Sequence, residues 1–143
     1  NAKGEDNTRL EQQPHIRYHG FVSSQALRGI SDRSDVLIHV ESFDEAIVSR
    51  LHYAFSTKLA QYLCAGRPIL CYAPERSTSS EYLRRENGAV TAANPDELRR
   101  GLERLLREPD FRAGYAERAR QLGMKNHDRE TTAARVRREI EAL

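Results

Sequence analysis

Two short apolar runs, each leading through a loop into a helix pattern, constrain the fold of this chain most strongly. Residues 36–40 (VLIHV) and residues 69–73 (ILCYA) are nearly continuous apolar segments of strand length. Runs of this kind are typical of strands that are buried on both faces, as in parallel sheets covered by helices. The sequence therefore predicts an α/β fold.

Further strand and helix patterns alternate with these two runs. Residues 15–19 (HIRYH) alternate like a half-buried strand that ends at Gly20, and residues 89–92 form a short fourth strand. Helices are predicted from Ser23 or Ser24 onward, over residues 56–65, over about 78–86, from Asn94 to about Glu108, from Pro109 to Gly123, and from near Asp128. This order predicts a Rossmann-like parallel sheet flanked by helices on both faces. Four strands are few for such a sheet, so we expect a strand to be missing.

The chain has the length of one domain. Its 143 residues divide into a polar lead-in over residues 1–14, which begins like a tag remnant, and one domain over residues 15–143 that ends in helices. Lys and Arg number 23 against 21 for Asp and Glu, and the net charge of +2 gives no field that would attract nucleic acid. We therefore expect no nucleic-acid partner.

The cysteines and the hydropathy pattern indicate the compartment. Cys64 and Cys71 lie within apolar patterns, without the spacing of a metal site, and are expected to be small core residues in a reducing environment. No apolar run reaches the roughly 20 residues of a membrane-spanning helix, and no signal peptide is visible. These features predict a soluble, cytoplasmic domain without a bound metal.

A long loop and the helix after it are the expected place for chemistry. Residues 41–55 show no clean period, which for a compact domain suggests a functional loop. The next helix is predicted to start at Ser56 or Thr57, with Lys58 in its first turn and Gly66 at its end. A helix N-terminus offers free N–H groups to a phosphate, and Lys58 would add a full charge. The alternative is that Ser56 only caps the helix and that Lys58 is solvated.

The position of these segments in the sheet supports a ligand site. Ligands of open α/β sheets bind beyond the carboxyl ends of the strands. The segments after Val40 and Ala73, and the turn after His19, are therefore the places to search. His39 could line such a cleft, or it could be a packed core histidine without a catalytic role.

The stretch from Phe55 to Leu70 resembles the donor-site helix of GT-B glycosyltransferases, especially the family 4 type. The family pattern reads E-G-F-G-x-x-x-x-E-A-M-A-x-G-x-P-V. Here Phe55 matches the Phe, residues 66–69 (GRPI) match the end of the pattern, and residues 55–59 match a subgroup that reads F-S-T-K-L. Further matches keep the family's order over roughly residues 16–123, at residues 19–22 (HGFV), 34–36 (SDV), 87–90 (NGAV) and 95–98 (PDEL).

This resemblance implies that the domain is the nucleotide-sugar-binding half of a GT-B fold. The candidate donor-binding residues are Ser56, Thr57 and Lys58 at the diphosphate, Gln61 at the ribose, Gly20, Phe21 and Val22 at the base, and Tyr53, Phe55, His39 and Glu41 in the cleft. The family pattern has two glutamates, and this chain has Tyr53 and Gln61 at those two positions instead. Gln61 keeps hydrogen-bonding ability without the charge, whereas Tyr53 does not replace an acid chemically. Catalytic residues remain unassigned.

The implied reaction is transfer of a sugar from a nucleotide diphosphate-sugar to an acceptor. The resemblance implies retention of anomeric configuration, no cofactor, and a bacterial role in polysaccharide or glycoconjugate biosynthesis. The acceptor would be bound by a separate N-terminal domain of the same protein, so the isolated domain should be inactive. A membrane contact is expected only through that N-terminal domain. Two alternatives are a non-enzymatic regulatory or interaction module and a nucleotide-sugar epimerase.

Overall fold

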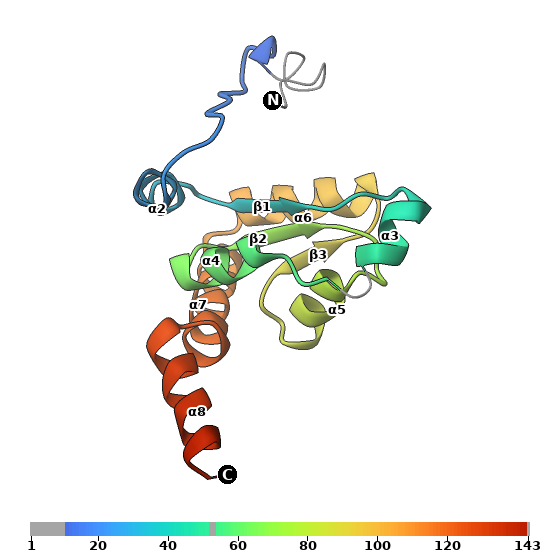
Figure 1. Cartoon of the computed structure of the whole chain (residues 1–143). Coiled ribbons are helices and arrows are strands. Elements are labelled where there is room, and N and C mark those ends of the chain that lie inside the picture. Colours follow the sequence, from blue (N-terminus) through green and yellow to red (C-terminus); the bar gives the residue numbers. More distant parts are fainter. Residues whose placement is uncertain (1–10, 52–53, 143) are drawn as a thin grey trace.

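The computed structural model describes residues 11–51 and 54–142 (Figure 1). Its sheet has three strands, in the order β1 (Leu37–Val40), β2 (Ile69–Tyr72) and β3 (Val90–Ala92). All pairings are parallel, with Leu37 opposite Ile69 and Leu70 opposite Val90. The predicted Rossmann-like α/β fold is confirmed.

The described helices lie before, between and after the strands. They are α2 (Ser24–Asp32), α3 (Glu45–Leu51), α4 (Thr57–Ala65), α5 (Thr78–Arg85), α6 (Pro95–Arg107), α7 (Pro109–Asn126) and α8 (Arg129–Glu141). Helix α6 lies over one face, and α4, α5 and α7 lie on the other (Figure 1). The main core forms on the second face, where Leu59 and Leu63 of α4 pack with Ile69 and Cys71 of β2.

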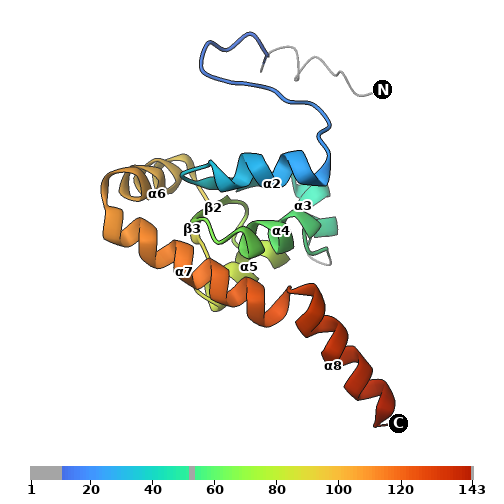
Figure 2. The same ribbon diagram turned by 90° about the vertical axis from the view of Figure 1, so that its left-hand side faces the viewer.

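The crossing of α4 and α7 depends on a small residue (Figure 2). A Cβ atom at Gly123 would lie 2.6 Å from the carbonyl carbon of Leu63 and 2.8 Å from the amide nitrogen of Cys64. Only glycine allows the two backbones to approach so closely. This contact fixes α4 against the sheet and so sets where its N-terminus lies.

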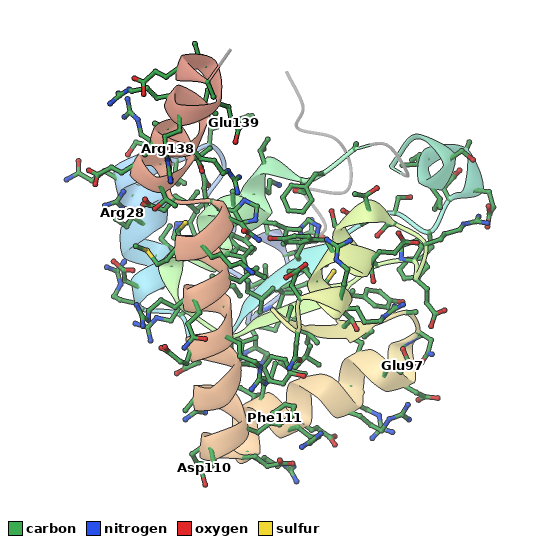
Figure 3. The ribbon with its side chains drawn as sticks, turned by 90° about the horizontal axis from the view of Figure 1, so that it is seen from below. Arg28, Glu97, Asp110, Phe111, Arg138 and Glu139 are labelled. Carbon is green, nitrogen blue, oxygen red and sulfur yellow. The ribbon has the colours of Figure 1, made fainter. Side chains whose placement is uncertain are left out.

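The end of the chain projects from the body. Helix α8 has no buried residue and extends beyond α7 (Figures 2 and 3). Arg138 and Glu139 lie far along it, whereas Asp110 and Phe111 mark the opposite end of α7 (Figure 3). Within the described part of the chain, no helix has both the length and the apolar character needed to cross a membrane.

Several predicted helix ends are confirmed by their hydrogen bonds. Ser23 accepts from the amide of Ala26 at 3.2 Å, and Asn94 accepts from the amide of Glu97 at 3.0 Å. Asp128 caps α8 in the same way, through the amide of Thr131 at 2.9 Å. At the end of α4, Gly66 adopts the left-handed conformation with φ of 64°.

The predicted strand over residues 15–19 is wrong. These residues form no strand, and residues 11–21 are exposed. A strand is stable only beside a partner that accepts its backbone hydrogen bonds, and no described strand pairs with this segment. The alternating pattern of residues 15–19 therefore does not lead to a strand. Gly20, with φ of 61°, ends an extended segment that belongs to no sheet.

Three further expectations need correction. Strand β1 is not buried on both faces, because it lies at an edge of the sheet and Ile38 and Val40 are 45% and 61% exposed there. The segment over residues 41–55 contains a helix, α3, which is too short to show a clear period. Cys64 is exposed because it follows Leu63, which turns toward the sheet, whereas Cys71 is buried as expected.

Candidate functional site

A cavity lies at the carboxyl end of β1, where ligand sites of such sheets are expected. Its volume is about 560 Å³. Strand β1 and the residues after it form one wall, α3 forms a second, and the start of α4 forms a third. The lining residues are Ile38, His39, Val40, Glu41, Ser42, Ile47, Ala54, Phe55, Ser56, Lys58 and Tyr62.

The start of α4 lies beside this cavity, where Ser56 and Lys58 belong to the lining. Ser56 is the N-cap residue, but its side chain makes no cap hydrogen bond, contrary to the expectation that it caps the helix. No described group accepts a hydrogen bond from the amide of Thr57 or Lys58. The Lys58 side chain is exposed and forms no ion pair with another described residue. The helix start and the Lys58 ammonium therefore offer positive charge to an anion on this wall of the cavity.

A buried His–Glu pair forms the floor of the cavity. His39 Nε2 and Glu41 Oε1 lie 3.0 Å apart, and each side chain is only 6% exposed. Burial raises the pKa of Glu41, but the nearby hydroxyl of Ser79, the His39 ring and the hydroxyl of Ser77 outweigh this effect and hold the pKa below that of an ordinary glutamate. Glu41 is therefore an ionised carboxylate at neutral pH. Because a carboxylate only accepts, Nε2 of His39 is the donor.

Aromatic contacts fix the residues that lead into α4. The ring of Phe55 stacks on His127 with centroids 5.6 Å apart and meets Tyr82 edge-on at 5.1 Å. The Tyr82 hydroxyl lies 2.8 Å from His127 Nε2 and accepts a hydrogen bond from Asn126 at 3.1 Å. Burial lowers the pKa of His127, so its ring is neutral at physiological pH. This cluster joins the start of α4 to the middle of α5 and the end of α7.

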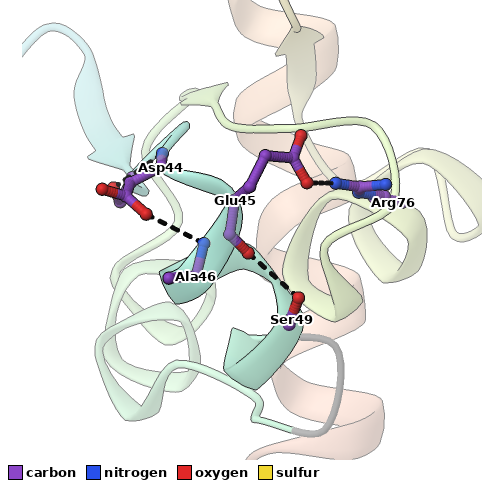
Figure 4. Close-up of polar contacts among 6 residues, drawn as sticks. Asp44, Glu45, Ala46, Ser49 and Arg76 are labelled. Carbon is purple, nitrogen blue, oxygen red and sulfur yellow. Dashed lines mark hydrogen bonds and ion pairs between the residues drawn. The ribbon is translucent and has the colours of Figure 1, made fainter.

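Helix α3 closes one side of the cavity and is held at its start (Figure 4). Asp44 Oδ1 accepts from the amide of Ala46 at 2.8 Å, and the Ser49 hydroxyl donates to the carbonyl of Glu45 at 3.0 Å. The Glu45 carboxylate pairs with Arg76, which precedes α5 (Figure 4). Both partners of this ion pair are exposed, so it contributes little to stability and serves chiefly to orient α3.

The structure brings some of the predicted site residues together and separates others. Phe55, Ser56, Lys58, His39 and Glu41 line one cavity. Thr57 is the first residue of α4 and lies between two of them in the chain, but it is not one of the lining residues. Gln61 lines a second cavity, of about 540 Å³, between α2, α4 and the junction of α7 and α8.

The predicted base-binding turn lies outside both cavities. Gly20, Phe21 and Val22 belong to the segment before α2, and the Phe21 side chain is fully exposed. Tyr53 lies outside the described residues. The roles proposed for Gln61, Tyr53 and this turn stay predictions.

Sequence reasoning missed the two serines that face Glu41. Ser77 and Ser79 are fully buried at the start of α5, beside the carboxyl end of β2. The sequence did indicate the segment after Ala73 as a place for a ligand site, and three more hydroxyl residues follow Ser77 there. Serines at the start of a helix are most often caps, however, so their presence did not predict a contact with Glu41. Cys71 adjoins the same cluster, and burial with the nearby Glu41 charge raises its thiol pKa to about 12, so it is no nucleophile.

A family model for proteins described as glycosyl transferase-like matches residues 4–138, which is nearly the whole chain. The chain belongs to the glycosyl transferase-like family. Searches of curated proteins and of solved structures each found no match.

Proposed function

We propose that this domain binds the nucleotide diphosphate-sugar donor of a GT-B glycosyltransferase of the family 4 type. One observation carries the proposal: the uncapped N-terminus of α4, with Lys58 in its first turn, opens into the cavity at the end of β1. Membership of the glycosyl transferase-like family supports glycosyl transfer in general. The acceptor would be supplied by a further domain of the protein.

The chemistry follows from where negative charge develops during transfer. As the bond between the sugar and the diphosphate breaks, charge accumulates on the departing phosphate oxygens. The N–H groups of Thr57 and Lys58, together with the Lys58 ammonium, would stabilise that charge. These donors are held by the packing of α4 against α7 and β2, so they need no rearrangement when the donor binds.

The proposal is tested by calorimetric titration of the purified chain with UDP, GDP and ADP. We expect one nucleotide to bind and Lys58→Ala to weaken it by about 1–3 kcal/mol, the value of a charge-assisted contact. Lys125→Ala is the matched control, because Lys125 is an exposed lysine in the last turn of α7 and lines neither cavity. Equal binding by wild type and Lys58→Ala would contradict the proposal.

A further inference from the structure

The start of α4 is held by a contact that is made just before the helix begins. Phe55 directly precedes the N-cap residue Ser56, whose side chain makes no cap hydrogen bond. An apolar side chain at this position commonly packs on the helix itself and fixes the angle at which the chain enters it. Here the Phe55 ring packs instead on rings of α5 and of the end of α7, since it meets Tyr82 edge-on and stacks on His127. The start of α4 therefore depends on residues that are distant in the sequence.

Helix α7 brings His127 to the start of α4 because the two helices run antiparallel. A Cβ atom at Gly66, just after α4, would lie 3.3 Å from Cγ of Arg120, and Gly123 lies against the backbone of Leu63. The N–H of His127 donates to the carbonyl of Gly123 at 2.8 Å, and its ring reaches the residue that leads into α4. The last turns of α7 thus follow α4 from its end to its start.

Hydrogen bonds hold the His127 ring in its stacked orientation. Asn126 Nδ2 donates to the Tyr82 hydroxyl oxygen at 3.1 Å, and this oxygen lies 2.8 Å from His127 Nε2. In either tautomer of the neutral ring these two atoms form a hydrogen bond, because a hydroxyl group both donates and accepts. The ring planes of His127 and Phe55 are 2° from parallel, with centroids 5.6 Å apart. A series of direct contacts therefore runs from the end of α7 to the start of α4.

We propose that His127 is a positioning residue for the donor site and that it acts through Phe55. Its ring holds Phe55, which fixes the start of α4, where the N–H groups of Thr57 and Lys58 have no described protein acceptor. Phe55 lines the cavity at the end of β1, whereas His127 lines the second cavity. The inference rests on the proposed function, and it gives the junction of α7 and α8 a part in donor binding without contact with the donor.

Nucleotide affinity tests this role with two variants of His127. His127→Ala removes the ring, and we expect it to weaken binding of the preferred nucleotide about two- to tenfold, the range for one aromatic contact. His127→Phe keeps a flat ring against Phe55, so it should recover most of that affinity although it loses the hydrogen bond to Tyr82. Tyr115→Ala is the control, because Tyr115 makes an aromatic contact with Phe111 in the same helix, at 4.9 Å, and lines neither cavity. It should leave the affinity of the folded protein unchanged.

Hydrogen exchange measures the start of α4 without nucleotide. The Leu59 amide donates to the Ser56 carbonyl at 3.1 Å, within the first turn of the helix. Exchange of this amide should be about two- to tenfold faster in His127→Ala than in wild type and close to wild type in His127→Phe. A general loss of stability would accelerate exchange in α6 as well, so the α6 amides serve as the internal reference.

The outcomes for the two proposals differ. Unchanged nucleotide affinity or unchanged Leu59 exchange in His127→Ala would overturn the positioning role. Equal losses in His127→Ala and His127→Phe, or an equal acceleration of the α6 amides, would also overturn it. In each of these cases, loss of binding in Lys58→Ala would leave the proposed function standing. If no nucleotide binds the wild type, the proposed function falls and the positioning role falls with it.

Discussion

The Glu41 carboxylate shows how neighbouring residues decide the state of a single group. Apolar burial alone would raise its pKa and favour the neutral acid. Ser79, His39 and Ser77 reverse that effect, and the pKa falls below that of an ordinary glutamate. The folded protein therefore stabilises the ionised form relative to the unfolded chain.

This shift predicts a pH dependence of stability. A lowered carboxyl pKa contributes stability that is complete above the unfolded pKa and is lost as the pH falls through the folded pKa. We expect Glu41→Gln to be less stable than wild type by about 1–3 kcal/mol at neutral pH, and the difference to shrink at acidic pH, as the carboxyl group takes up a proton. Urea denaturation of both proteins at neutral and at acidic pH measures it, and a difference independent of pH would contradict the prediction.

The placement of α4 depends on its crossing with α7. Gly123 lies against the backbone of Leu63 and Cys64, so an added methyl group must push two helices apart. We expect Gly123→Ala to lower the free energy of unfolding by about 1–3 kcal/mol. Gly114→Ala in the same helix is the control, because its Cβ would meet only the flexible end of Arg118, at 3.3 Å. The Gly114→Ala variant should be more stable than wild type, by up to about 1 kcal/mol. Chemical denaturation measures the free energy of unfolding of both variants. An equal change in the two variants would contradict the prediction.

Some elements could be predicted from local sequence and others could not. The capped helices at Asn94 and Asp128 and the buried strand at residues 69–72 depend on nearby residues, and they formed as expected. The segment over residues 15–19 has the alternation of a strand but lacks a described partner. Ser79 comes near Glu41 only because it follows β2, the strand that pairs with β1. Both outcomes depend on contacts between distant segments, which a single sequence does not display.

Across the whole molecule, stability is concentrated in the sheet and the helices packed on it. Helix α8 buries no residue, so deleting residues 129–143 should leave Tm nearly unchanged. A longer deletion, of residues 119–143, removes Ala119, Leu122 and Gly123 from the core and should prevent folding. Thermal denaturation followed by circular dichroism compares the two truncations. A large loss of stability in the shorter one would show that α8 supports the fold.

The most direct test of the donor-site claim is to map where a nucleotide diphosphate binds. Amide chemical shifts of the isotopically labelled chain would be followed during titration with the nucleotide that calorimetry selects. We predict that the largest changes fall on Thr57 and Lys58, followed by Glu41 and Ser42 across the cavity. Changes confined to the second cavity, at residues such as Cys64 and His127, would contradict the account.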